Sequence, residues 1–147
     1  MPADRPYLAE NAAARGRLRA LTERLGDADL ERDLGEGWTV SMALAHLAYW
    51  DRRVESILAR WQREGAASPS PTDDDVVNEA LRPIWRAVPP RAAVLLALEA
   101  ADAADRAIES LTPALADAAV APDSPLNARR WQHRTEHIEQ IERALGR

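Results

Sequence analysis

Apolar residues recur at alternating spacings of four and three near the start of the chain, and this periodicity constrains the fold more than any other feature. Such spacing places side chains along one stripe of an α-helix, because the helix completes a turn about every 3.6 residues. The stripe predicts a first helix from about Pro6 to Leu25, ended by Gly26. Its members are Tyr7, Asn11, Ala14, Leu18, Leu21 and Leu25. Since no segment shows sustained period-two alternation rich in β-branched residues, the sequence predicts no strands.

The second predicted helix is the longest. Thr39 or Ser41 can serve as its N-cap, and the helix is expected to stop at Gly65, where a glycine- and proline-rich turn follows. A third helix is expected after a cap at Thr72, with three aspartates in its first turn, where a helix N-terminus favours negative charge. Pro83 is expected to kink or end this helix, because proline lacks the backbone N–H.

The rest of the chain predicts two more long helices. One covers roughly residues 91–111, and the last begins near Leu126 or Asn127 and ends at Gly146. The proline-rich stretch between them predicts a loop with at most one helical turn. Each long helix has a polar face, so the apolar stripes must be buried against one another. Residues 1–147 are therefore expected to form one all-α domain, a four-helix bundle with one extra short helix.

Composition excludes several kinds of chemistry. The chain has no cysteine, so it cannot supply a disulfide, a thiolate ligand or a cysteine nucleophile. All 19 basic residues are arginine, which excludes a Schiff-base lysine and a P-loop lysine. The net charge of −5, with acids and bases interleaved, argues against nucleic-acid binding. Because no apolar run is long enough to span a bilayer and no signal peptide is apparent, a cytoplasmic protein without membrane contact is expected.

The three histidines are the strongest functional signal. His133 and His137 lie four residues apart on the last predicted helix, where side chains at this spacing project side by side and can ligate one metal ion. His46 lies at the edge of the apolar stripe of the second helix and is expected to point toward a partner helix. If the two helices are neighbours in register, the three imidazoles form an open, zinc-type site. The alternative is a core histidine at 46 and a solvated pair.

Polar residues near the histidines are candidates for orienting an imidazole N–H. Asp51 follows His46 by five residues, and Glu136 lies between the two histidines of the pair. The alternative for both carboxylates is an ordinary surface ion pair with Arg52, Arg53 or Arg134.

Other residues are candidates for the substrate pocket. Arg130 and Arg134 are candidates for attracting an anionic substrate, although solvated arginines are the alternative. Asn78 is a candidate for facing the pocket, with a surface amide as the alternative. Trp131 is expected to form a pocket wall.

Two segments carry a family resemblance. The segment WTVSMALAHLAYWD at residues 38–51, followed by HRTEHIEQIE at 133–142, resembles the DinB superfamily. That superfamily includes YfiT-like proteins and the N-terminal domain of mycothiol-dependent maleylpyruvate isomerases. The resemblance spans nearly the whole chain and implies a four-helix bundle with a divalent metal on His46, His133 and His137. It also implies a possible homodimer and the use of a low-molecular-weight thiol.

The sequence leaves two readings of function open. In the first, a Zn²⁺ or Ni²⁺ site serves a thiol-dependent S-transferase or isomerase, or a hydrolase, acting on a small molecule. In the second, the chain is a non-catalytic metal-binding bundle that acts as a dimeric ligand-binding or stress-related protein. No catalytic residue beyond the metal ligands is assigned.

Overall fold

The computed structural model describes residues 5–146 and is mostly helical, as the sequence predicts. The described part of the chain forms seven helices and one two-stranded antiparallel sheet. In chain order these elements are α1 (Pro6–Glu23), α2 (Asp27–Leu30), β1 (Asp33–Gly35), β2 (Trp38–Thr39), α3 (Val40–Glu64), α4 (Asp74–Ala87), α5 (Pro90–Glu109), α6 (Pro113–Ala119) and α7 (Arg130–Ala144).

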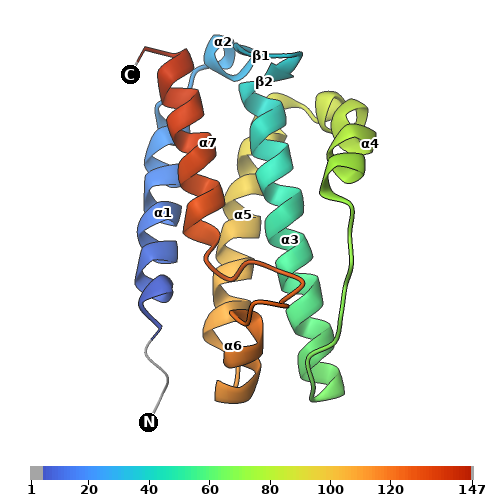
Figure 1. The fold of residues 1–147 in the computed structure, drawn as a ribbon. Coiled ribbons are helices and arrows are strands. Elements are labelled where there is room, and N and C mark those ends of the chain that lie inside the picture. Colours follow the sequence, from blue (N-terminus) through green and yellow to red (C-terminus); the bar gives the residue numbers. More distant parts are fainter. Residues whose placement is uncertain (1–4, 147) are drawn as a thin grey trace.

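Four long helices, α1, α3, α5 and α7, lie side by side (Figure 1). The colours of Figure 1 show that α1 and α7 run upward, whereas α3 and α5 both run downward. The parallel pair α3 and α5 is possible because the chain returns along the bundle before α4, which lies beside the upper end of α3. None of the helices in the described range is long and apolar enough to cross a membrane.

The prediction that the chain has no strands is wrong for one short hairpin. Strands β1 and β2 pair before α3, and a turn with three consecutive positive φ angles joins them, at Gly35 (101°), Glu36 (55°) and Gly37 (83°). Strands of three and two residues are too short to show an alternating pattern. The segment between the first two predicted helices therefore contains the short helix α2 and a hairpin that leads directly into α3.

The helix α3 begins and ends at the predicted residues, whereas α4 begins one residue later than predicted and is not ended by its proline. The Thr39 side chain accepts a hydrogen bond from the Met42 N–H, and Gly65 ends α3 in the left-handed conformation with φ of 72°. Asp73 rather than Thr72 caps α4. The helix continues past Pro83 to Ala87, because this proline lies on the exposed side, where water can satisfy the carbonyl that loses its partner.

The start of α7 is set by a tertiary contact. The helix begins at Arg130, later than the predicted start at Leu126 or Asn127, and α6 forms within the predicted loop. The buried Asn11 side chain of α1 donates from Nδ2 to the Ala128 carbonyl and accepts from the Trp131 N–H, both at 2.9 Å. A side chain from the first helix thus satisfies backbone groups at the start of the last.

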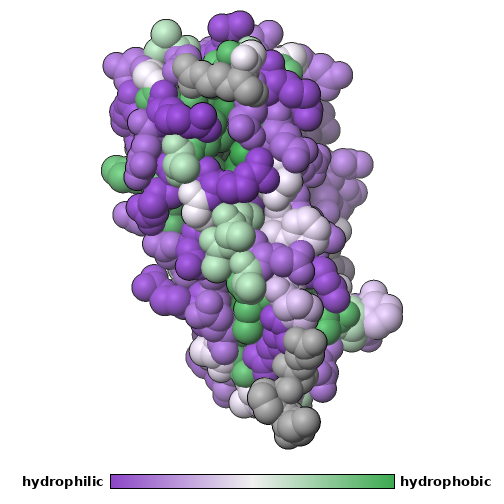
Figure 2. Space-filling view, turned by 90° about the vertical axis from the view of Figure 1, so that its left-hand side faces the viewer, coloured by the Kyte–Doolittle hydropathy of each residue, from purple (hydrophilic) through white to green (hydrophobic). Residues whose placement is uncertain are grey.

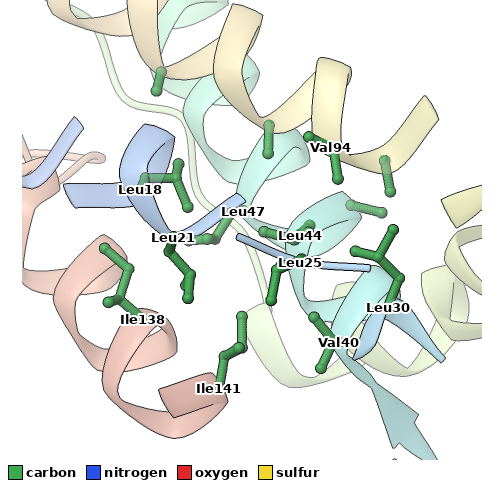
Figure 3. Packing of buried hydrophobic residues seen from close by; sticks show 14 of the residues in the cluster. Leu18, Leu21, Leu25, Leu30, Val40, Leu44, Leu47, Val94, Ile138 and Ile141 are labelled. Atoms are coloured by element: carbon green, nitrogen blue, oxygen red, sulfur yellow. The ribbon is translucent and has the colours of Figure 1, made fainter. Parts of the chain in front are cut away.

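The core forms where the four long helices meet. Figure 3 shows side chains of α1, α3, α5 and α7 pointing toward one another, including Leu21, Leu47, Val94 and Ile138. Full burial of each such side chain contributes roughly 1.5–3 kcal/mol. The surface on the α1 side is mostly hydrophilic (Figure 2).

Candidate metal centre

The structure brings the three histidines together from two helices. His46 lies on α3 and is buried, and His133 and His137 lie half-buried on α7. The Nε2 atom of His133 is 3.0 Å from that of His46 and 3.2 Å from that of His137. One ring nitrogen from each residue lies within 4.8 Å of the others, so the group can hold a metal ion. The alternative of a core histidine and a separate solvated pair is therefore wrong.

The spacing of these nitrogens suits a tetrahedral ion. Zinc bonds imidazole nitrogen at about 2.0–2.1 Å, which separates two ligands in a tetrahedral site by about 3.3 Å. The two Nε2 separations of 3.0 and 3.2 Å lie close to this value. The third pair of ligand atoms, from His46 and His137, lies within 4.8 Å.

Packing explains why the rings converge. The Trp38 ring at the hairpin and the Trp85 ring of α4 contact the His46 ring edge to face, with centroids 5.6 and 5.1 Å away. Leu47 and Ile138, which follow His46 and His137 in the chain, are both buried in the core. Because each of these histidines is next to a buried residue, the packing of α3 and α7 fixes the register of the rings.

Burial keeps two of the rings neutral. It lowers the pKa of His46 to about 3, and the positive charge of a protonated His137 adds to this effect. The pKa of His133 is lowered to about 2, chiefly by burial and then by the Arg130 guanidinium. A neutral imidazole retains one lone pair, so neither ring has to give up a positive charge before it binds a cation at neutral pH.

The buried rings predict that the protein loses stability in mild acid. An unfolded histidine has a pKa of about 6.5. As the pH falls below this value, His46 and His133 become protonated in the unfolded chain but stay neutral in the folded protein. The contribution of these two histidines to the free energy of unfolding is therefore fully present above pH 6.5. It declines as the pH falls toward the pKa values of the folded protein. Between pH 7 and pH 5, His46 alone is expected to reduce the free energy of unfolding by about 2 kcal/mol.

Urea unfolding of the chelator-treated protein at several pH values tests this prediction. The His46→Gln variant, which lacks one of the buried rings, should show a shallower pH dependence. Equal slopes in the variant and the wild-type protein would show that His46 is not held neutral by the fold.

Gln140 orients one ring and was missed by the sequence analysis. Its Oε1 atom lies 2.9 Å from His137 Nδ1, and since a carbonyl oxygen only accepts, Nδ1 carries the proton. The lone pair of His137 is thereby fixed on Nε2, the atom that faces the other histidines. The spacing of three residues on one helix was a signal available in the sequence.

The carboxylate candidates do not contact an imidazole in the described part of the chain. Asp51 is buried and accepts from Arg130 Nε at 2.7 Å, and the Arg130 Nη2 donates to His133 Nδ1 at 3.1 Å. Asp51 therefore positions Arg130 rather than a histidine, because a separation of five residues turns its side chain away from His46. Glu136 is exposed, lines the pocket described below and makes no ion pair with Arg134. The prediction of a direct imidazole orienter is wrong for Asp51. The ion-pair alternative holds for its partner Arg134, but this pair is buried rather than at the surface.

The hydrogen bond from Arg130 determines the proton position on His133. An arginine can only donate, so Nδ1 accepts and the ring proton lies on Nε2, which can donate it to His46 Nε2 or His137 Nε2. For a metal ion to bind at His133 Nε2, this proton must move to Nδ1, and the hydrogen bond from Arg130 is then lost. The Nδ1 atom of His46 is buried without a hydrogen-bond partner among the described residues, so the aromatic contacts and the contact between its Nε2 and His133 orient that ring.

A cavity of about 560 Å³ opens onto all three imidazoles. This volume is within the range of small-molecule sites, about 300–1,000 Å³. The Asn78 side chain, a candidate for facing the pocket, lines the cavity, and its Oδ1 accepts from the Trp50 Nε1 at 2.9 Å. The remaining lining residues are Asp74, Asn127, Arg130, Gln132 and Glu136. We call this cavity the polar pocket.

Two predicted pocket residues lie elsewhere. Arg134 is fully buried and bound to Asp51 and Asp105, so it cannot attract an anionic substrate. Trp131 packs among apolar residues at the other end of the bundle, because two residues before His133 is nearly the opposite side of a helix. Trp50 of α3 supplies the aromatic wall instead.

Comparisons with known proteins do not identify the chain. No protein-family model, curated protein or solved structure gives a significant match.

Proposed function

We propose that this chain is a metal-dependent enzyme of the DinB-like superfamily that holds one Zn²⁺ or Ni²⁺ ion on His46, His133 and His137. The convergence of the three Nε2 atoms carries this proposal. Burial keeps two of the three rings neutral, which is the state in which an imidazole binds a metal ion. The donor set fits the metal, since imidazole nitrogen is a preferred ligand of both ions.

The three ligands leave a coordination position for a reactant. Bound there, a divalent ion would lower the pKa of a water or a thiol, so that either becomes a nucleophile near neutral pH. The chain has no cysteine, so any thiol must be a diffusible small molecule. The reaction supported best is therefore S-transfer, isomerisation or hydrolysis of a small molecule in the polar pocket.

Other residues of the polar pocket can accept a proton, donate hydrogen bonds to a substrate and supply positive charge. The exposed Glu136 carboxylate lines the pocket and can accept the proton that a bound thiol or water releases. The Asn78 carbonyl is already paired with Trp50, so its amide N–H groups remain available to a substrate. Arg130 is paired with Asp51 and supplies a fixed positive charge beside His133.

Metal analysis and a thiol assay test the proposal together. We expect about one equivalent of zinc or nickel in the purified protein, and a helical far-UV spectrum that persists after chelation. Melting of the helices on chelation would assign the metal a structural role and contradict the proposal. Turnover of an aromatic electrophile with one of several small thiols would support S-transfer, whereas full metal occupancy without turnover of thiol or ester substrates would favour the non-catalytic alternative.

A homodimer stays a prediction. Among the described residues, four large apolar side chains are exposed on two consecutive helices, Val76 and Ile84 on α4 and Leu95 and Leu96 on α5. Sedimentation of the purified protein measures the oligomeric state.

Gln140→Ala is expected to weaken zinc binding about tenfold, as removal of a hydrogen bond behind a ligand typically does. The His137 ring then loses the acceptor that holds its proton on Nδ1. Gln140→Glu is the matched control, because a carboxylate accepts the same hydrogen bond and should preserve or raise the affinity. Competition titration with a zinc-sensitive dye measures both variants, and equal affinities would rule out this role for Gln140.

A further inference from the structure

A second cavity lies against two of the three histidines. It has a volume of about 350 Å³ and shares His46 and His137 with the polar pocket. Its other lining residues come from the hairpin and from both helices, namely Leu34, Gly35, Glu36, Trp38, Ala43 and Gln140. We call this cavity the hairpin pocket. The imidazoles of His46 and His137 thus lie between two separate spaces.

The two pockets differ in chemistry. Among the described residues that line the polar pocket, Trp50 is the one apolar side chain, and amides and charged groups surround the histidines. The hairpin pocket has three apolar walls, formed by Leu34, Trp38 and Ala43. Its two other polar side chains offer little to a charged ligand. Gln140 is already hydrogen-bonded to His137, and Glu36 lies exposed in the turn. Such walls favour an uncharged organic group over an ion.

Contacts from α4 hold the hairpin in place over this pocket. The Arg82 side chain donates to the Glu36 carbonyl, and its guanidinium lies 5.3 Å from the centre of the Trp38 ring. Arg86 donates to the Gly37 carbonyl at 3.3 Å. Gly37 permits this approach, since an added Cβ would lie 2.8 Å from an Arg82 nitrogen. The pocket is therefore a preformed space with walls from α3, α7 and the hairpin.

We propose that the hairpin pocket is a second subsite, which binds an uncharged aromatic or branched aliphatic group at the same time as a metal-bound reactant occupies the polar pocket. This inference rests on the proposed metal site and extends it to a two-reactant site. The polar reactant reaches the ion from the side lined by all three histidines. The apolar partner lies across His46 and His137, within a few ångströms of the same centre.

Paramagnetic relaxation of a fluorine probe tests the proposal. Co²⁺ replaces the native metal, and fluorobenzene serves as the probe because it is uncharged and lacks a strong metal donor. The ¹⁹F relaxation of fluorobenzene should be faster with the Co²⁺ protein than with the Zn²⁺ protein. Saturating imidazole, which occupies the open coordination position, should leave this enhancement in place. In Ala43→Leu, where the added carbons fill the hairpin pocket, the enhancement should be lost.

Controls separate this proposal from the proposed metal site. Leu34→Trp fills the pocket from the hairpin, and it replaces Ala43→Leu if that change in the buried α3 surface prevents folding. Gln132→Ala, at a residue that lines the polar pocket but not the hairpin pocket, should keep the enhancement. Displacement of the probe by imidazole, no enhancement in the wild-type protein, or an unchanged enhancement in the filled variants would each overturn the second subsite. Failure of the protein to bind Co²⁺ at all would overturn the metal site as well.

Discussion

Arg134→Ala is expected to lower the free energy of unfolding by about 3–5 kcal/mol, the typical cost of removing one partner from a buried ion pair. Arg134 is fully buried and bridges two buried carboxylates, with Nη2 2.9 Å from Asp105 and 3.3 Å from Asp51. Its Nη1 also donates to the Asn11 carbonyl at 3.2 Å. The variant leaves both carboxylates without a shared counter-charge in a space that water does not reach. Urea unfolding followed by circular dichroism measures the loss.

Arg17→Ala is the matched control. The Arg17 side chain also pairs with a carboxylate, that of Glu142 at 3.2 Å, but it is 48% exposed. Its removal should cost less than about 1 kcal/mol. Arg134→Lys should fall between the two, because an ammonium keeps the charge but cannot reproduce the planar fork of donors. A cost for Arg134→Ala as small as that of Arg17→Ala would show that the network does not stabilise the fold.

His137→Ala is expected to weaken zinc binding by more than about 100-fold, because losing a ligand costs more than losing the group that orients one. The side chain is half-buried at the pocket, so the helices should keep their far-UV spectrum. His133→Ala should give a similar loss, since its Nε2 lies between those of the other two histidines. Isothermal titration or dye competition with Zn²⁺ measures the affinity.

Gln132→Ala is the control for the metal prediction. Gln132 lines the same pocket and lies on the same helix, but its Oε1 accepts from Asn127 and contacts no imidazole. This variant should bind zinc as the wild-type protein does. Zinc affinity that is equal in His137→Ala and Gln132→Ala would contradict the three-histidine site.

Acid sensitivity and metal affinity are coupled through the same rings. Protonation of His46 and His133 is opposed by burial, so protons compete weakly with a metal at these two ligands. Arg134 bonds to carboxylates and to backbone carbonyls rather than to imidazoles, and its charge is the smallest of the contributions that lower the pKa of His133. The Arg134 variants therefore report mainly on the buried ion pairs, and the histidine variants report on the metal ligands.

Several features followed from local chemistry alone. The spacing of apolar residues identified the four long helices, and the N-cap at Thr39 and the stop at Gly65 were both confirmed. The pair His133 and His137 was a local pattern as well, since four residues bring side chains together on any helix. Local signals succeed here because each depends only on residues within one or two turns.

Tertiary structure decided what lies beside the histidines. No local pattern connects Asp51 to Arg130, or Asn11 to the start of α7, because these contacts join residues more than 75 positions apart in the chain. Trp131 and Arg134 were assigned to the pocket from their nearness in sequence, yet the helix turns both away from it. The sequence by itself determined which residues can bind a metal. Only the packing of α3 against α7 decided that the three rings meet, since register between distant helices depends on the fit of whole core surfaces.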